Sequence, residues 1–406
     1  MDAVNAVWVL VSAALVLFMV PGLALFYGGM SRSKNILNML MMNMVCLGIV
    51  PVVWVVAGYT LSSAPSGTKL IGNFDHLFFK GVDLVAEDGS SPMLLAFFAL
   101  TFAAITPALI SGAVADRLKF SAWVVFVPAW LMLVFVPTWA WVFRGDNGLL
   151  SSRGSLDFAG GTVVHVAAGA SSLALVLVLG KRQGWQVEPI LPHNLPFTML
   201  GAGILWFGWF GFNAGSALAV TDVAVQAFAN TFLAAAVAML AWLAVERIVD
   251  GHATSLGAAS GIVAGLVGIT PGAGFMGLAG ASVVGALAGA LCALAVRLKF
   301  KLGYDDALDV VGVHMVGGLV GGLLIGLVAD SSMFTEPNPD HDGLFFGGGL
   351  GLLGEQILAN AVVLVYAFAV TWVIATVLKA TIGLRVAPDA ELEGLDRSEH
   401  AEAAYS

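Results

Sequence analysis

Charged residues are scarce in this sequence. Asp, Glu, Lys and Arg make up 11% of its 406 residues, against about 25% in ordinary soluble domains. Hydrophobic residues make up 59%, and the mean hydropathy is +0.94. A soluble fold is therefore not expected. The net charge of -9 and the lack of a basic cluster also argue against a nucleic-acid partner.

The sequence also lacks the groups on which most enzymes and metalloproteins depend. Its two cysteines, Cys46 and Cys292, lie inside apolar runs without metal-ligand spacing, so we expect neither a disulfide nor a metal site. We find no nucleophile with a base, no metal cluster and no nucleotide-binding loop. An enzyme is therefore the least favoured class, and no cofactor is expected.

Long apolar runs dominate what is present. A helix needs about 20 apolar residues to cross the hydrocarbon core of a bilayer. Because the runs are apolar on all sides and do not alternate, they predict helices and not a barrel. We count eleven predicted spans, at residues 4–27, 36–60, 91–114, 120–143, 158–180, 194–213, 223–246, 253–271, 277–297, 306–329 and 352–380.

Basic residues between the predicted spans set the orientation. Thirteen of the 17 Lys and Arg residues fall on one side, and only Lys69, Lys80, Arg144 and Arg153 fall on the other. Loops rich in Lys and Arg stay in the cytoplasm. We therefore predict a multi-pass protein of the cytoplasmic (inner) membrane, with its N-terminus outside and its C-terminus inside.

The chain divides into a membrane domain, residues 1–386, and a polar, acidic tail, residues 387–406. The tail is expected to be cytoplasmic, and either a regulatory contact or simple solvation would account for its composition. We expect the loop from Ser62 to Ser90 to lie outside the membrane.

A short internal repeat is the most informative pattern. Asp157-Phe-Ala-Gly-Gly-Thr-Val-Val-His165 opens the fifth span and Asp306-Ala-Leu-Asp-Val-Val-Gly-Val-His314 opens the tenth. Five spans separate the two copies, and an odd number of crossings inverts the second copy relative to the first. We therefore predict an all-α protein with a five-plus-five inverted repeat, over about 4–180 and about 194–329, and an additional eleventh helix.

The inverted repeat places two histidines at the same depth. Each lies eight residues inside its span, roughly 12 Å from its own side, so both should lie near the middle of a core about 30 Å thick. An ionisable side chain at that depth indicates a functional site, although a structural hydrogen-bonded pair is the alternative. Two imidazoles in contact can share a proton and offer an acceptor to an N–H group. Burial disfavours charge, so we expect the pair to hold at most one proton.

Several motifs, in order along nearly the whole chain, resemble the ammonium transporter (Amt) family. Besides the segment from Asp157 to His165, these are Pro21-Gly-Leu-Ala-Leu-Phe-Tyr-Gly-Gly-Met, Trp209-Phe-Gly-Phe-Asn-Ala-Gly-Ser216, Ile269-Thr-Pro-Gly-Ala-Gly274 and Asp309-Val-Val-Gly-Val-His314. The resemblance implies a homotrimer of eleven-span subunits, each with its own pore for ammonium or ammonia. It also implies a tail that contacts PII-type nitrogen-regulatory proteins.

The resemblance assigns roles to individual residues. His165 and His314 match the paired pore histidines, and Phe102 and Phe212 match the stacked rings of the outer gate. In the outer site that recruits ammonium, Ser216 matches the hydroxyl acceptor and Asp157 the buried acid beneath it. Where relatives carry a Trp, this sequence has Phe143, with Trp141 as the alternative. The supporting residues that we select are Trp209, Asn213 and Thr270, and for Trp209 an aromatic belt anchor is the alternative.

Ammonium and potassium share a charge and a similar size, so selectivity requires acceptors for N–H bonds. We expect ammonium to lose a proton at or below the outer site and ammonia to pass the histidines, with or without the proton following, because an intact cation is costly at the membrane centre. Two rival functions remain: a Rh-type channel for neutral ammonia or carbon dioxide, and an ammonium sensor. Only residues 387–406 follow the membrane domain, so no fused signalling domain is expected.

Overall fold

The computed structural model describes residues 1–64, 66–87, 89–188 and 190–405, and helices dominate them. The eleven helices that are long and apolar enough to cross a membrane within these residues match the predicted spans to within a few residues. The α-helices are α1 (Ala3–Met30), α2 (Ile36–Val53), α3 (Tyr59–Ser63), α4 (Pro92–Ser111), α5 (Phe120–Trp130), α6 (Val136–Phe143), α7 (Ala167–Leu179), α8 (Leu195–Asn213), α9 (Asp222–Val249), α10 (Ser255–Ile269), α11 (Leu278–Leu302), α12 (Val316–Val328), α13 (Gly351–Thr381), α14 (Pro388–Glu393) and α15 (Leu395–His400).

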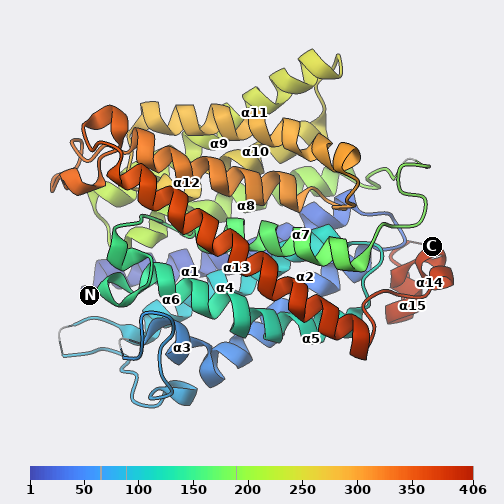
Figure 1. Cartoon of the computed structure of the whole chain (residues 1–406), viewed down its shortest axis with the longest axis horizontal. Coiled ribbons are helices and arrows are strands. Elements are labelled where there is room, and N and C mark those ends of the chain that lie inside the picture. The colour runs from blue at the N-terminus through green and yellow to red at the C-terminus, as the bar shows by residue number, and fades with distance from the viewer. Residues whose placement is uncertain (65, 88, 189, 406) are drawn as a thin grey trace.

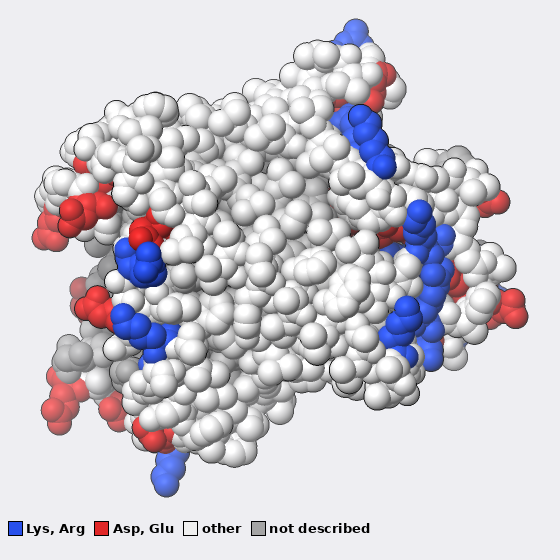
Figure 2. Space-filling view, in the orientation of Figure 1, with Lys and Arg blue, Asp and Glu red and all other residues white. Residues whose placement is uncertain are grey.

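The helices run along one common direction, and the two chain termini lie at opposite ends of the bundle (Figure 1). Figure 2 shows a broad band without charged side chains between the two ends, and Lys and Arg gather at the end that carries the C-terminus. An uncharged band of this kind is what a bilayer requires. We call the two ends the N-terminal side and the C-terminal side.

Four spans contain a π-helical turn, in which one additional residue is inserted into the helix. These turns cover Trp54–Gly58, Leu131–Phe135, Gly161–Val166 and Val311–Met315. Pro51 and Pro128 stand three residues before the first two turns. A proline removes a backbone N–H from the helix ladder, and π-helical turns are frequent at functional sites. The other two turns hold the two histidines, His165 and His314.

The two histidine-bearing spans pack closely in the centre of the bundle. A Cβ on Gly169 would lie 2.4 Å from the backbone nitrogen of Met315, and one on Gly318 would lie 3.0 Å from the carbonyl oxygen of Gly161. Small residues allow helix backbones in a membrane to approach in this way. The glycines that follow each histidine therefore bring the two π-helical turns against each other.

The tail packs against the C-terminal side of the bundle and is not simply solvated. Leu395 and Asp396 are buried, and the backbone N–H of Leu395 donates to the Asn35 side chain over 2.8 Å. The backbone N–H of Asn38 donates to the Asp396 carboxylate, and that of Phe120 donates to Glu399. The tail thus joins the loops at the starts of α2 and α5.

Candidate functional site

The two central histidines are in direct contact. The Nδ1 atoms of His165 and His314 are 3.3 Å apart, and the ring centroids are 5.3 Å apart. Both side chains are buried, with 1% and 3% of their surface exposed. At this distance one Nδ1 can donate a hydrogen bond to the other. Nε2 of His165 has no hydrogen-bond partner among the described residues.

The surroundings of the histidine pair are apolar. Trp209 and Phe212 lie nearly parallel to the His165 ring, with centroids at 5.4 and 6.0 Å. The cavity beside the pair has a volume of about 10 Å³, which is at the lower limit for one water molecule. Its other lining residues are Met19, Leu23, Ile105, Leu109, Val164, Leu205 and Val263. This lining offers a bare cation nothing to replace its water.

Two phenylalanine rings separate the histidines from the N-terminal side. The centroids of Phe102 and Phe212 are 4.3 Å apart, and at most 1% of either residue is exposed. Phe102 belongs to α4 and Phe212 to the last turn of α8. The structure therefore brings together the two residues that were predicted to form the outer gate, and their rings are in contact.

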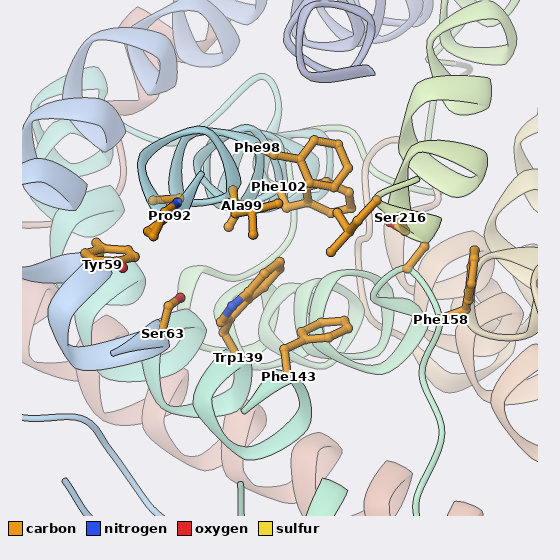
Figure 3. Close-up of a pocket in the computed structure, with 14 residues that line it drawn as sticks. Tyr59, Ser63, Pro92, Phe98, Ala99, Phe102, Trp139, Phe143, Phe158 and Ser216 are labelled. Atoms are coloured by element: carbon orange, nitrogen blue, oxygen red, sulfur yellow. The ribbon is translucent and has the colours of Figure 1, made fainter. Parts of the chain in front are cut away.

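A larger cavity lies directly above this gate on the N-terminal side (Figure 3). Its volume is about 350 Å³, and no Lys, Arg, Asp or Glu is among its lining residues. Aromatic faces attract cations through their quadrupole, and hydroxyl oxygens accept N–H bonds. The lining residues are Tyr59, Ser63, Pro92, Leu95, Ala96, Phe98, Ala99, Phe102, Trp139, Phe143, Phe158, Ala159, Ser216 and Leu218. We call this the aromatic cavity.

Ser216 supplies the hydroxyl acceptor at the floor of the aromatic cavity. Its Oγ donates to the carbonyl oxygen of Phe212 over 2.8 Å. With its single proton engaged, the hydroxyl has only lone pairs left, which can accept a hydrogen bond. Such an oxygen can accept a hydrogen bond from an ion that carries N–H groups.

Asp157 lies outside the lining of the aromatic cavity and holds the start of the fifth span. Its carboxylate accepts backbone N–H bonds from Gly160, Gly161, Thr162 and Val163 over 2.7–3.4 Å. Burial raises the pKa of Asp157 to about 6, and the four donors act against this rise. The position fits the predicted role of an acid that orders the site without touching the substrate.

Asp306 occupies the equivalent position in the second repeat. Its Oδ2 accepts the backbone N–H of Val311 over 2.7 Å, whereas its buried Oδ1 has no partner among the described residues. The backbone conformation is repeated as well. The residue three positions after each acid has a positive φ, which is 98° at Gly160 and 65° at Asp309. The inverted repeat thus extends from the sequence to the backbone conformation.

The aromatic residues of α6 separate into two faces. Phe143 lines the aromatic cavity, as does Trp139, whose ring centroid lies 4.4 Å from that of Phe143 and 5.8 Å from that of Phe102. Trp141 points elsewhere: its indole N–H donates to the carbonyl of Leu70 over 2.9 Å. The structure therefore places Phe143 in the site and Trp141 outside it. Sequence reasoning missed Trp139, although its spacing of four residues from Phe143 predicts a shared helix face.

The supporting residues hold the helices around the site. Trp209 is buried against His165 and donates from its indole N–H to the Thr270 hydroxyl over 2.8 Å, so it is not an aromatic belt anchor. Asn213 donates to the Thr231 hydroxyl and joins the end of α8 to α9. Three described residues of the loop between Ser62 and Ser90 are bonded to this part of the bundle: Trp141 donates to the carbonyl of Leu70, and Arg144 donates to the carbonyls of Ser66 and Thr68.

Comparison with known proteins gives a consistent result. Residues 7–405 match the Ammonium Transporter Family. An ammonium transporter of Mycobacterium tuberculosis is 50% identical to this chain, over the whole chain and 90% of the relative.

Solved structures agree in fold. The Mep2 protein of Candida albicans superimposes with a TM-score of 0.89 and 32% identity, over 96% of this chain and 87% of the other. A protein described as a sensor Amt protein superimposes with a TM-score of 0.90 and 29% identity, over 99% and 98%.

Proposed function

This chain belongs to the Ammonium Transporter Family, and on that premise we propose that it transports ammonium across the membrane by way of the paired histidines. The observation that carries this proposal is the buried contact between His165 and His314, beneath an aromatic gate and inside an apolar lining. That order of features suits a substrate that arrives as a cation and crosses the centre as a neutral molecule.

The aromatic cavity recruits ammonium. A cation over an aromatic face gains roughly 0.5–2 kcal/mol, and Phe102, Trp139 and Phe143 supply three such faces. Ser216 adds an oxygen that accepts an N–H bond. Potassium gains from the rings but has no N–H to give to the hydroxyl, so recruitment favours ammonium.

The aromatic gate and the apolar lining favour ammonia beyond this point. Burying an unpaired cation there costs at least several kcal/mol, whereas neutral ammonia donates and accepts hydrogen bonds and avoids most of that cost. Ammonium is therefore deprotonated at or below the aromatic cavity, and ammonia passes the histidines. The hydrogen bond between the two Nδ1 atoms offers a route for the released proton to follow, which makes transport electrogenic.

Two rival functions use the same fold. A Rh-type channel would pass neutral gas without recruiting ammonium, and the aromatic cavity with its Ser216 acceptor argues against it. A sensor shares the architecture, so the fold alone does not separate a sensor from a transporter. Measuring ammonium flux separates them, because a pure sensor does not need to transport ammonium.

Further features follow from the family and the charge distribution. The N-terminal side faces outward across the cytoplasmic membrane, because Lys and Arg gather on the C-terminal side (Figure 2). The functional unit is a homotrimer with one pore in each subunit. Each subunit consists of a membrane domain, residues 1–386, and a tail, residues 387–406. The packed tail presents Leu392 and Tyr405 to solvent, and a PII-type regulatory protein binds there.

The test is ammonium-evoked current and ammonia flux in proteoliposomes, for the intact protein, His165→Ala and His314→Ala. We expect current in the intact protein and a loss of roughly 100-fold in each variant, typical of groups that transfer protons. Cys46→Ala, a buried change away from the histidines, is the control and should keep its current.

Other outcomes separate the rivals. Ammonia flux without current in the intact protein would support the neutral-gas channel and contradict the proton route. Ammonium binding without any flux would support the sensor. A current of the same size with potassium would contradict selective recruitment.

A further inference from the structure

A second cavity, of about 330 Å³, lies on the C-terminal side of the histidines. Unlike the aromatic cavity, it is lined by four charged side chains, those of Arg182, Glu188, Lys299 and Asp309. Arg182 is bound by the carboxylate of Asp305, with contacts of 2.8 and 2.9 Å. The Lys299 side chain of α11 and the Asp309 carboxylate, just before the tenth span, both line this cavity, which we call the inner cavity.

Lys299 comes from the last turn of α11, and only 8% of it is exposed. Its Nζ donates to the Asp309 carboxylate over 2.6 Å and to the backbone carbonyl of Asp306 over 2.9 Å. The same nitrogen lies 5.4 Å from the centre of the Phe300 ring. A carboxylate, a carbonyl oxygen and an aromatic face thus surround a primary ammonium group.

These are the kinds of group that would bind a free ammonium ion. The aromatic cavity also combines aromatic faces with an oxygen acceptor, but its site has no tethered cation. The inner site adds a full negative charge, from Asp309, and the backbone carbonyl oxygen of Asp306. Without a resident cation, this site would hold ammonium more tightly than the aromatic cavity does.

The backbone conformation at Asp309 sets the position of its carboxylate. Its φ of 65° lies in the left-handed region, which disfavours residues other than Gly, Asn and Asp. The equivalent residue in the first repeat is Gly160, which adopts this conformation without cost. Asp is one of the few residue types other than Gly that tolerate this conformation, and here the conformation places a carboxylate against the Lys299 ammonium.

We propose that Lys299 is a tethered ammonium that fills a cation site at the inner cavity, so that the exit neither retains ammonium nor admits it from the C-terminal side. The inference deepens the proposed function and depends on it. Lys299 is a specificity-determining residue for ammonium entry from the C-terminal side: the aromatic cavity is open to ammonium, whereas the inner site is already occupied. Because the Lys299 ammonium is covalently attached, it occupies the inner site whatever the ammonium concentration is, whereas the occupancy of a site for a free ion changes with the concentration of that ion.

The test removes the tethered charge. Lys299→Met keeps the length and apolar character of the stem, and Lys299→Arg keeps the charge. Lys301→Met is the matched control, because Lys301 lies on the same helix and is exposed. Ammonium flux is measured in right-side-out and in inverted membrane vesicles, which present opposite sides of the protein to the added ammonium.

We expect Lys299→Met to lower the ratio of flux from the N-terminal side to flux from the C-terminal side, by roughly threefold to tenfold, as expected when a charge that controls entry is removed. Lys299→Arg and Lys301→Met should keep the ratio of the intact protein. An unchanged ratio in Lys299→Met, or an equal change in Lys301→Met, would overturn the inference. Absence of flux in the intact protein would instead contradict the proposed function.

Binding provides a second, independent measurement. Thermal unfolding of purified protein is compared in ammonium chloride and potassium chloride. Lys299→Met should be stabilised by ammonium more than the intact protein is, since it has gained a free site, and the double variant Lys299→Met/Asp309→Asn should lose that gain. Equal ammonium stabilisation of Lys299→Met and the double variant would contradict the site. If Lys299→Met alone does not fold, the flux ratio is measured in the double variant, which leaves no unpaired charge. A ratio equal to that of the intact protein would then contradict the inference.

Discussion

The aromatic cavity and the inner cavity adjoin two copies of the same backbone motif, but their lining residues differ in chemical character. On each side an acid precedes a histidine by eight residues, a residue with positive φ follows the acid, and a π-helical turn carries the histidine. The cavity on the N-terminal side is aromatic and uncharged, whereas that on the C-terminal side holds Lys299 on Asp309. The repeat therefore determines where the histidines meet, and the side chains around it make the two cavities chemically different.

The most direct test of the difference between the two repeats is to replace the acid at the start of each one, Asp157 or Asp306. Asp157→Ala should lower the free energy of unfolding by about 3 kcal/mol, because four backbone N–H groups lose their acceptor. Asp306→Ala should cost about 1 kcal/mol, because one such bond is lost and an unpaired buried oxygen disappears with it. Unfolding in mixed micelles with increasing SDS measures both.

Equal losses in the two variants would mean that the repeats are equivalent in energy as well as in shape. Asp83→Ala, at an exposed position in the N-terminal-side loop, serves as the control and should change the free energy of unfolding by less than about 0.5 kcal/mol.

A pH titration sharpens the difference at the inner acid. Burial raises the pKa of Asp306 to about 6, with the Lys299 ammonium opposing the rise, against about 3.9 for an unfolded Asp. The fold therefore favours the protonated acid, so the stability that this group contributes is fully present below about pH 4 and is lost as the pH rises through 6. Asp306→Asn is neutral at every pH, and its amide oxygen can still accept the Val311 N–H.

We expect Asp306→Asn to gain stability relative to the intact protein as the pH rises from 4.5 to 7.5, by about 2 kcal/mol. The measurement is thermal unfolding in detergent at both pH values. A gain of Asp306→Asn that is the same at both pH values would show that the acid is already ionised in the folded protein at pH 4.5.

The smallest expected effect concerns the two tryptophans of α6. Trp139→Leu removes an aromatic face from the aromatic cavity and should raise the ammonium concentration for half-maximal current about twofold to fivefold, equivalent to about 0.5–1 kcal/mol of cation–π attraction. Trp141→Leu loses its bond to the Leu70 carbonyl but no part of the cavity. Its half-maximal concentration should stay unchanged. The reverse pattern would assign the recruiting face to Trp141.

Much of the architecture was predictable from the sequence for two physical reasons. The thickness of a bilayer sets the length of each apolar run, so all eleven spans could be located to within a few residues. An odd number of spans between two copies of a motif inverts one copy, so His165 and His314 could be placed at one depth. Their contact follows from that depth and from the glycines that let the two spans approach.

Which side chains face the cavities was decided only by the tertiary structure. The spacing of Trp139 and Phe143 puts them on one face of α6, but the π-helical turn at Leu131–Phe135 inserts a residue ahead of α6 and so helps to set which face meets the cavity. Trp141, on another face, donates to the loop. The partner of Asp309 was equally hidden, because Lys299 reaches it from another helix, and the tail docks on loops more than 270 residues away in sequence. Hydropathy and periodicity report how each segment meets lipid, whereas contacts between segments depend on the packing of all of them together.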